Sequence, residues 1–120
     1  MKWLLKDQGT SYPATLPHHI ERRLRFALVR FVDRVERVIV FLQDNNGPRG
    51  GVDKVCRILV KARGCGAIMA TASNSEWTVA VDRAATRIGH TLSRQLGRLR
   101  DRRIQAYRTS VAGATSLAPG

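Results

Sequence analysis

The residues best suited to chemistry in this sequence are basic side chains set at helical spacing. Within a stretch rich in Ala and Leu, they recur every three or four residues, at Arg83, Arg87, His90, Arg94 and Arg98. On a helix this spacing places them along one side. Guanidinium groups bind phosphate in bidentate fashion and stack on bases. A solvated face would also be basic in a basic protein, but no acidic residue interrupts the series, which favours a phosphate-binding surface.

The composition points to the same class of partner. The chain has 120 residues, of which 21 are Lys or Arg and 9 are Asp or Glu, giving a net charge of +12. Arginine supplies 17 of the 21 basic residues and lysine 4. The charge is spread along the whole chain, so we expect the folded domain itself to bind a polyanion, with nucleic acid favoured.

Other chemistries find little support. The adjacent His18 and His19 would point about 100° apart on a helix, without a third metal ligand nearby. The glycine-rich segment 47–51 lacks the order of a nucleotide-binding loop and is typical of a hairpin turn. Asp44 and Asp53 flank that turn without an obvious nucleophile, and no elbow motif relates Ser, His and Asp. We therefore expect no catalysis, cofactor, metal or small-molecule substrate.

The cysteines, the apolar runs and the first residues of the chain indicate the cellular location. Cys56 and Cys65 fit neither a disulfide framework nor a metal knuckle, so we expect structural thiols in a reducing compartment. The longest apolar run, around Val38–Leu42, is far below the roughly 20 residues of a membrane span, so we expect no membrane association. Residues 1–7 do not resemble a secretion signal. A cytoplasmic location is the expectation.

Hydrophobic periodicity predicts the elements that must position the basic residues. Alternating and β-branched segments predict strands at 2–6, 35–43, 52–61 and 67–72. Helical spacing predicts a helix from Pro17 to Phe31 and a final helix that starts at the capping-box sequence Ser73–Glu76, with Ser73 as its cap. The order β-α-β-β-β-α predicts an α+β fold, with two helices packed on one face of a four-stranded, mainly antiparallel sheet.

Each predicted helix has an apolar stripe for the core. In the first helix, Arg22, Arg23 and Arg30 fall outside the stripe. Phe26 and Val29 also fall outside it, and two apolar residues there fit a second contact surface or a partner. The stripes consist of Ile20, Leu24, Ala27, Leu28 and Phe31 in the first helix, and of Trp77, Val81, Ala84, Ala85, Ile88, Leu92, Leu96 and Leu99 in the last. We expect a single domain over residues 1–105 and a disordered tail over 106–120, where small uncharged residues dominate.

Part of the sequence is similar to a known family. The segment from Phe41 to Arg57, FLQDNNGPRGGVDKVCR, resembles the strand–turn–strand region of ribosome hibernation-promoting factors, also called ribosome-associated translation inhibitor A or sigma-54 modulation protein. Trp77–Ala85 and Arg87–Arg94 resemble the family's final helix. The resemblance covers roughly residues 16–103, and the length corresponds to the family's short form, without the second, dimerising domain of long members.

The resemblance implies a fold like that of a double-stranded-RNA-binding domain and a function without catalysis. Members lodge in the small ribosomal subunit, in the channel that binds mRNA and tRNA, and silence the ribosome under stress. We therefore expect the small subunit and its rRNA as partners and a monomer when free. Neutralised rRNA phosphates would release counterions, which makes such binding sensitive to salt.

The resemblance also suggests individual contacts. Arg87, Arg94 and Arg23 match basic positions of the family pattern, which makes them the first candidates for rRNA binding. His90 stands where many members have a permanent cation, so its contact would be weaker or dependent on pH. Geometry and charge alone add further candidates, namely Arg22, Arg30, Arg83 and Arg98.

Two other functions fit the same sequence. A general RNA- or DNA-binding protein would use the same basic helices on any polyanion. A regulatory protein–protein module, as the older sigma-factor name suggests, would use Phe26 and Val29 as its contact surface. Binding to a protein would be insensitive to salt, which separates it from both nucleic-acid functions.

Overall fold

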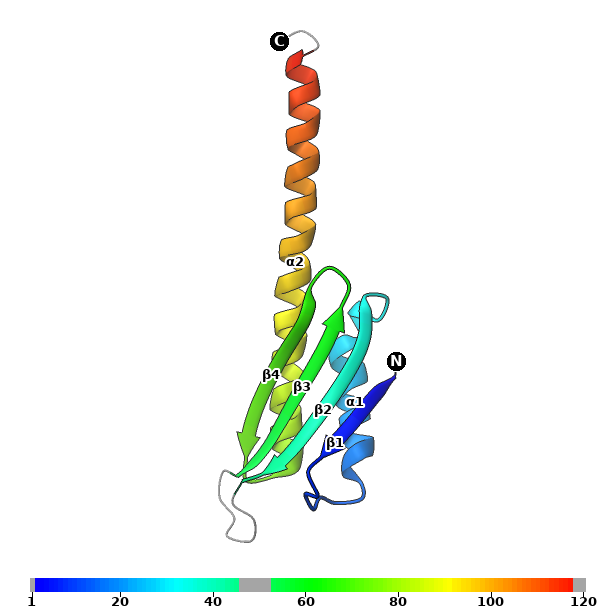
Figure 1. Cartoon of the computed structure of the whole chain (residues 1–120), viewed down its shortest axis with the longest axis vertical. Helices are drawn as coiled ribbons and strands as arrows, with labels where there is room; N and C mark the ends of the chain where they lie inside the picture. Colours follow the sequence, from blue (N-terminus) through cyan, green and yellow to red (C-terminus); the bar gives the residue numbers. More distant parts are fainter. Residues whose placement is uncertain (1, 46–52, 118–120) are drawn as a thin grey trace.

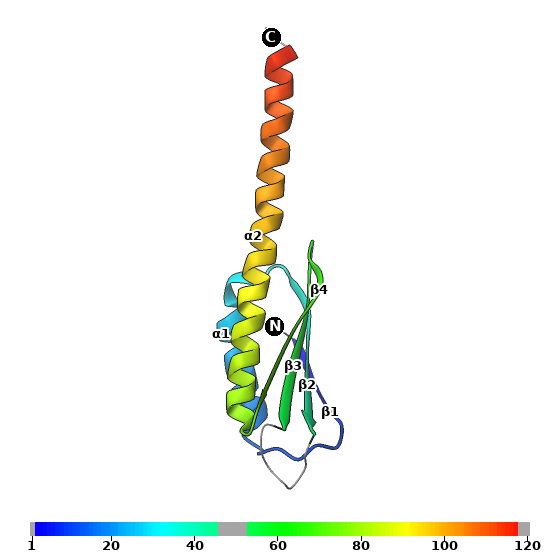
Figure 2. The same cartoon turned by 90° about the vertical axis from the view of Figure 1, so that its left-hand side faces the viewer.

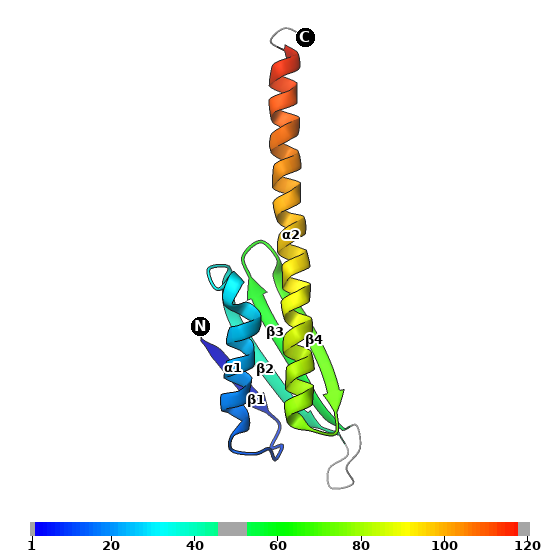
Figure 3. The same cartoon turned by 180° about the vertical axis from the view of Figure 1, so that it is seen from behind.

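The computed structural model describes residues 2–45 and 53–117, and it describes only the backbone of residues 99–103 and 109–117. A four-stranded sheet and two long helices follow one another in the order β-α-β-β-β-α, which confirms the predicted α+β class. Both helices lie on the same face of the sheet, as the edge-on view of Figure 2 and the rear view of Figure 3 show. The opposite face faces the viewer in Figure 1 and is covered by no described element.

The sheet is mixed, with strand order β1-β2-β3-β4. The edge strand β1 (Trp3–Asp7) runs parallel to β2 (Val35–Asp44). Two antiparallel pairs follow, between β2 and β3 (Lys54–Ala62) and between β3 and β4 (Gly66–Asn74). The first two strands are parallel because a helix crosses over between them, whereas the others are joined by hairpin connections.

The connection between β3 and β4 is a tight turn that needs glycine. Gly64 and Gly66 have φ angles of +84° and +68°. Residues with a Cβ atom rarely adopt this backbone conformation. Within the turn the amide of Cys65 donates to the carbonyl oxygen of Ala62 over 3.1 Å. The other hairpin turn, predicted at 47–51, lies outside the described residues.

The first helix, α1 (Leu16–Leu28), continues into a short 3-10 turn, Val29–Phe31, so the predicted end at Phe31 marks the end of both together. Pro17 lies in the first turn, where its missing N–H costs no hydrogen bond. Every fourth residue points into the core, and the four buried ones are Leu16, Ile20, Leu24 and Leu28.

The last helix, α2 (Trp77–Leu117), begins differently from the predicted capping box. Ser73 is still part of β4, where it pairs with Val55 across the sheet, so its hydroxyl does not cap the helix. Instead the side-chain oxygen of Asn74 accepts the amide of Glu76 over 3.0 Å. Strand pairing therefore extends beyond the predicted end of β4 and moves the start of the helix along the chain.

At its other end, α2 differs from the expected boundary near residue 105. The backbone stays helical to Leu117, through most of the segment predicted to be disordered. Its 41 residues correspond to about 60 Å, so the second half of α2 projects beyond the sheet (Figure 1). The reason lies in the composition: Ala, Leu, Arg and Gln favour the helix, and no proline occurs between residues 77 and 118.

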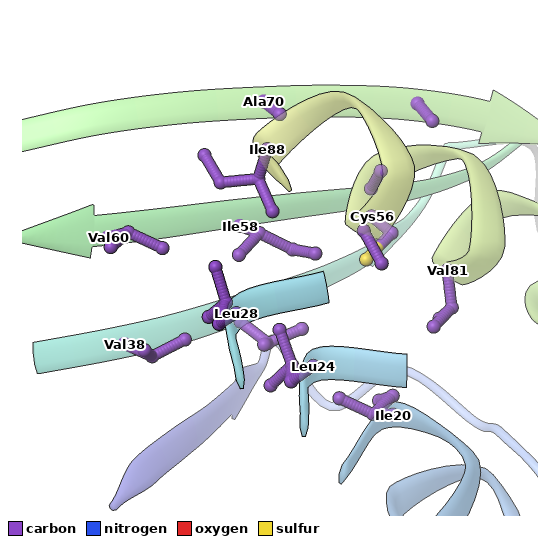
Figure 4. Packing of buried hydrophobic residues seen from close by; sticks show 14 of the residues in the cluster. Ile20, Leu24, Leu28, Val38, Cys56, Ile58, Val60, Ala70, Val81 and Ile88 are labelled. Atoms are coloured by element: carbon purple, nitrogen blue, oxygen red, sulfur yellow. The ribbon is translucent and has the colours of Figure 1, made fainter. Parts of the chain in front are cut away.

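The core fills the space between the helices and the sheet. Alternate strand residues such as Val38 and Ile58 meet Leu24 of α1 and Ile88 of α2 there (Figure 4). The predicted stripe of α2 is buried from Trp77 to Leu92, Leu96 is partly buried, and the side chain of Leu99 lies outside the described ones. No helix in the described part of the chain is long and apolar enough to cross a membrane.

Candidate nucleic-acid interface

The basic series of α2 lies on the side of the helix that faces away from the core. The helix buries Ala84, Ala85, Ile88 and Leu92 against the sheet and α1. All five members of the series are exposed, namely Arg83, Arg87, His90, Arg94 and Arg98. We refer to these five residues as the basic ladder. None of them forms an ion pair with a side chain that the structure describes, so their charges face solvent.

Two members of the ladder are held by hydrogen bonds that leave most of their donors free. Arg87 donates through Nη1 to the carbonyl oxygen of Thr71, on the outer edge of β4. This contact satisfies one backbone acceptor of an edge strand. Arg94 donates to the hydroxyl oxygen of Thr91 over 3.5 Å. A guanidinium has five N–H donors, so both side chains can still bind an anion.

A hollow of about 340 Å³ lies between α2 and β4. Arg87, His90 and Arg94 line it together with Met69, Ala70 and Thr91. The hollow therefore brings three consecutive members of the ladder to one place, although Arg87 and Arg94 are seven residues apart in sequence. A phosphate group seated there would meet donors from two arginines and one imidazole.

On α1 and the 3-10 turn that follows it, the three candidate arginines have different environments. Arg22 is exposed and forms no ion pair with a described side chain. Arg30 is exposed as well, with its guanidinium 5.2 Å from the centre of the Phe31 ring. Arg23 is half-buried and held by three groups. Its Nε lies 3.2 Å from Oδ1 of Asp82, its Nη2 donates to the hydroxyl of Thr86 over 3.3 Å, and it lies 5.6 Å from the centre of the Phe26 ring.

These contacts give Arg23 a part in joining the two helices. Asp82 and Thr86 belong to α2, so the side chain of Arg23 bridges from one helix to the other. With 31% of its side chain exposed, Arg23 still presents part of its charge to solvent. Sequence reasoning did not anticipate this pairing, because Asp82 lies far along the chain and precedes the ladder by one residue.

A second hollow, of about 380 Å³, lies between α1 and α2. Apolar groups of both helices form most of its wall, and Arg23, Arg30 and His90 lie among its lining residues. The helices approach each other closely beside it, where a Cβ on Gly89 would lie 3.2 Å from the carbonyl oxygen of Ala27. His90 lines both hollows, so it connects the α1 arginines with Arg87 and Arg94 into one basic surface.

Among the other side chains considered from the sequence, His19, Asp44 and Asp53 have charged partners. His19 lies 2.7 Å from Asp82, while His18 is exposed. Nζ of Lys54 lies 3.8 Å from Oδ2 of Asp44 and 3.7 Å from Oδ2 of the buried Asp53. Both cysteines are free thiols. In the described ranges, no three of the His, Cys, Asp and Glu side chains are arranged to hold a metal ion.

Comparison with known proteins shows what the fold is similar to. The chain matches no protein-family model, and no curated protein sequence matches it either. Among solved structures it is similar to a ribosomal subunit interface protein from Coxiella burnetii, with a TM-score of 0.63 and 19% identity, over 79% of this chain and 96% of that one. It is also similar to the N-terminal domain of Protein Y from Thermus thermophilus, with a TM-score of 0.61 and 20% identity, over 77% of this chain and 94% of that one. The protein therefore shares the α+β fold of these two structures.

Proposed function

We propose that this protein is a ribosome hibernation factor without catalytic activity, which binds the rRNA of the small ribosomal subunit in the mRNA and tRNA channel and inhibits translation. The observation that carries the proposal is the continuous basic surface of α2 and α1, joined through His90. It occurs in a fold shared with a ribosomal subunit interface protein. A cytoplasmic location follows from the proposed partner.

The electrostatics support binding to an RNA backbone. The ladder alone contributes four arginines, all exposed and unpaired among the described side chains. Side chains three or four residues apart on a helix start about 5–6 Å from one another, so several cations of the ladder can contact phosphates of one RNA segment. Such contacts position a protein on RNA without reading its sequence. The rRNA contacts in this proposal are Arg87, Arg94, Arg23, His90, Arg22, Arg30, Arg83 and Arg98.

The test is co-sedimentation with purified small ribosomal subunits over a salt series, with and without bound mRNA and initiator tRNA. Duplex RNA and duplex DNA serve as comparison ligands. The proposal expects tight binding to the subunit that is lost when mRNA and tRNA occupy the channel. Equal binding to all three nucleic-acid ligands, without competition, would make the protein a general nucleic-acid binder instead.

A pair of double variants tests the surface. Arg87→Glu/Arg94→Glu reverses two charges of the ladder and is expected to abolish binding to the subunit. Arg37→Glu/Lys61→Glu makes the same change of charge at two exposed, directly paired positions of the open sheet face, and is expected to retain most of it. Retained binding in the first variant would rule out the ladder as the interface.

One observation favours a second candidate function, a protein–protein module. Phe26 and Val29 on the outer side of α1 and its extension are 76% and 65% exposed, and the neighbouring Val32 is 49% exposed. Exposed apolar residues that lie together often mark a binding surface. A partner bound there would be released by Phe26→Ser and would be insensitive to salt, whereas RNA binding would be sensitive to it.

A further inference from the structure

The face of the sheet opposite the helices has a composition of its own. Strand residues alternate between the two faces, so those next to core residues point outward to this open face (Figure 1). Its central positions are Leu4, Lys6, Ile39, Phe41, Gln43, Val55, Arg57, Leu59, Met69 and Thr71.

The register aligns these residues in two neighbouring rows. One row is apolar and crosses all four strands, with Leu4 opposite Ile39, Ile39 opposite Leu59 and Leu59 opposite Met69. Its outer members Leu4 and Met69 are 49% and 51% exposed. A sheet face that contacts only water is not expected to have an apolar row across all four strands, so this row indicates a binding surface.

The second row has an aromatic ring between two cations. Phe41 on β2 is directly opposite Lys6 on β1 and Arg57 on β3. Paired Cβ atoms in a sheet lie about 5 Å apart, so the side chains of Lys6 and Arg57 leave the sheet on either side of the Phe41 side chain. Phe41 is partly exposed, and Lys6 and Arg57 are exposed.

A hollow of about 320 Å³ opens at this row. Its lining includes Phe41, Lys6, Arg57, the amide of Gln43 and the thioether of Met69. Asp7 also lines the hollow, and its carboxylate accepts hydrogen bonds from the amide of Gly9 and the hydroxyl of Tyr12. The volume is at the lower end of the range of ligand pockets, about 300 Å³.

We propose that this hollow binds an unstacked base of single-stranded RNA. The ring of Phe41 would lie against the base, the amide of Gln43 would hydrogen-bond with the base edge, and Lys6 and Arg57 would neutralise the phosphates on either side. Aromatic rings on an open sheet, flanked by basic residues, are a recurrent way to bind unpaired bases. The pairing of one ring with two cations favours RNA over an apolar protein segment, because an apolar segment has no anionic group to bind the two cations.

This site goes beyond the proposed function, because it lies on the face of the sheet opposite the helices. The protein would then hold two RNA segments at once, a structured one on the basic ladder and a single strand on the open face. Binding of a single strand at the open face does not require any particular structured RNA on the ladder.

The experiment measures fluorescence anisotropy of labelled oligo(A) and oligo(U) hexaribonucleotides, and of a labelled RNA duplex, with the full chain. Phe41→Leu leaves the net charge unchanged, and loss of one stacked base is expected to weaken hexamer binding about tenfold. Duplex binding and the salt dependence should stay the same. Tyr107→Leu removes an exposed aromatic ring from the projecting part of α2, also without a change of net charge, and is the control; it should bind both ligands like the unmodified chain.

Two further variants keep the test decisive if Phe41→Leu fails to fold. Phe41→Tyr retains the aromatic face and should retain hexamer binding. Arg57→Gln should reduce the slope of log affinity against log salt for the hexamer by about 0.7. The proposal is overturned if the unmodified chain does not bind the hexamers, or if Phe41→Leu and Tyr107→Leu bind them equally well. If the unmodified chain does not bind the RNA duplex, the basic ladder is not a site for structured RNA. The proposal for the open face is not affected by that result.

Discussion

Nε2 of His19 on α1 lies 2.7 Å from Oδ1 of Asp82 on α2, and the same carboxylate oxygen is 3.2 Å from Nε of Arg23. One acidic side chain on α2 therefore holds two basic groups of α1. These contacts occur at the edge of the basic surface, where Asp82 is 43% exposed. The carboxylate both joins the helices and reduces the positive charge available to a ligand.

Asp82→Asn is expected to change stability and RNA binding in opposite directions. The substitution removes the charge of a partly exposed pair, which lowers the free energy of unfolding by about 1 kcal/mol or less. It also releases the charge of Arg23, so affinity for duplex RNA should rise. Urea unfolding and duplex binding at low salt measure the two effects. Glu76→Gln removes an exposed carboxylate before α2 and is the control; an equal gain in affinity there would mean that net charge alone is responsible.

His90→Arg is expected to strengthen binding of structured RNA, because it places a permanent cation between the two hollows of the basic surface. One added phosphate contact should steepen the slope of log affinity against log salt by about 0.9. Titrations at pH 7.5 over a salt series provide the measurement. His18→Arg adds the same charge at an exposed position outside both hollows. If both variants change the slope equally, His90 does not lie in the interface.

Gly89→Val is expected to destabilise the fold. A Cβ at this position would meet the carbonyl oxygen of Ala27 at 3.2 Å, and the larger side chain would push α1 away from α2. Overpacking of this kind typically costs about 1–3 kcal/mol. Gly97→Val is the matched control, because a Cβ there has no neighbour within 4 Å. The difference in urea midpoint between the two variants tests the close approach, and equal midpoints would contradict it.

The two cysteines are expected to differ in reactivity. Burial raises the pKa of the Cys56 thiol to about 12, so at pH 8 it has almost no thiolate, which is the reactive form. Cys65 is only half-buried. A thiol reagent should therefore modify one cysteine quickly in the folded protein and the second only on unfolding. Cys65→Ser should remove the fast phase, and a fast phase that persists in this variant would show that Cys56 is accessible.

The raised pKa of Cys56 also predicts a loss of stability in alkali. The thiol has an ordinary pKa of 9.0, so between about pH 9 and pH 12 the unfolded chain loses a proton that the folded chain retains. Fewer protons bound in the unfolded state mean that stability falls as pH rises through this window. Cys56→Ala should reduce this slope in urea unfolding between pH 9 and pH 11, with Cys65→Ala as the control. An unchanged slope in both variants would contradict the assignment.

The sequence alone determined the class of fold and the position of the basic ladder. Both follow from local periodicity, because a repeat of two residues buries one face of a strand and a repeat of 3.6 buries one side of a helix. The buried stripe from Trp77 to Leu92 consequently fixes which residues of α2 face solvent. The same reasoning misplaced the start of α2, since whether Ser73 caps a helix or pairs in a strand depends on β3 beside it.

Relationships between distant segments were decided only by the tertiary structure. The pairing of Arg23 with Asp82 depends on how α1 and α2 pack, which no local pattern encodes. Alternation along β3 directs Arg57 away from the buried Cys56 and Ile58, but only the register of three strands brings Lys6, Phe41 and Arg57 into one row. A shift of one residue in any strand would turn its side chain into the core, so the open-face site exists because the whole sheet sets that register.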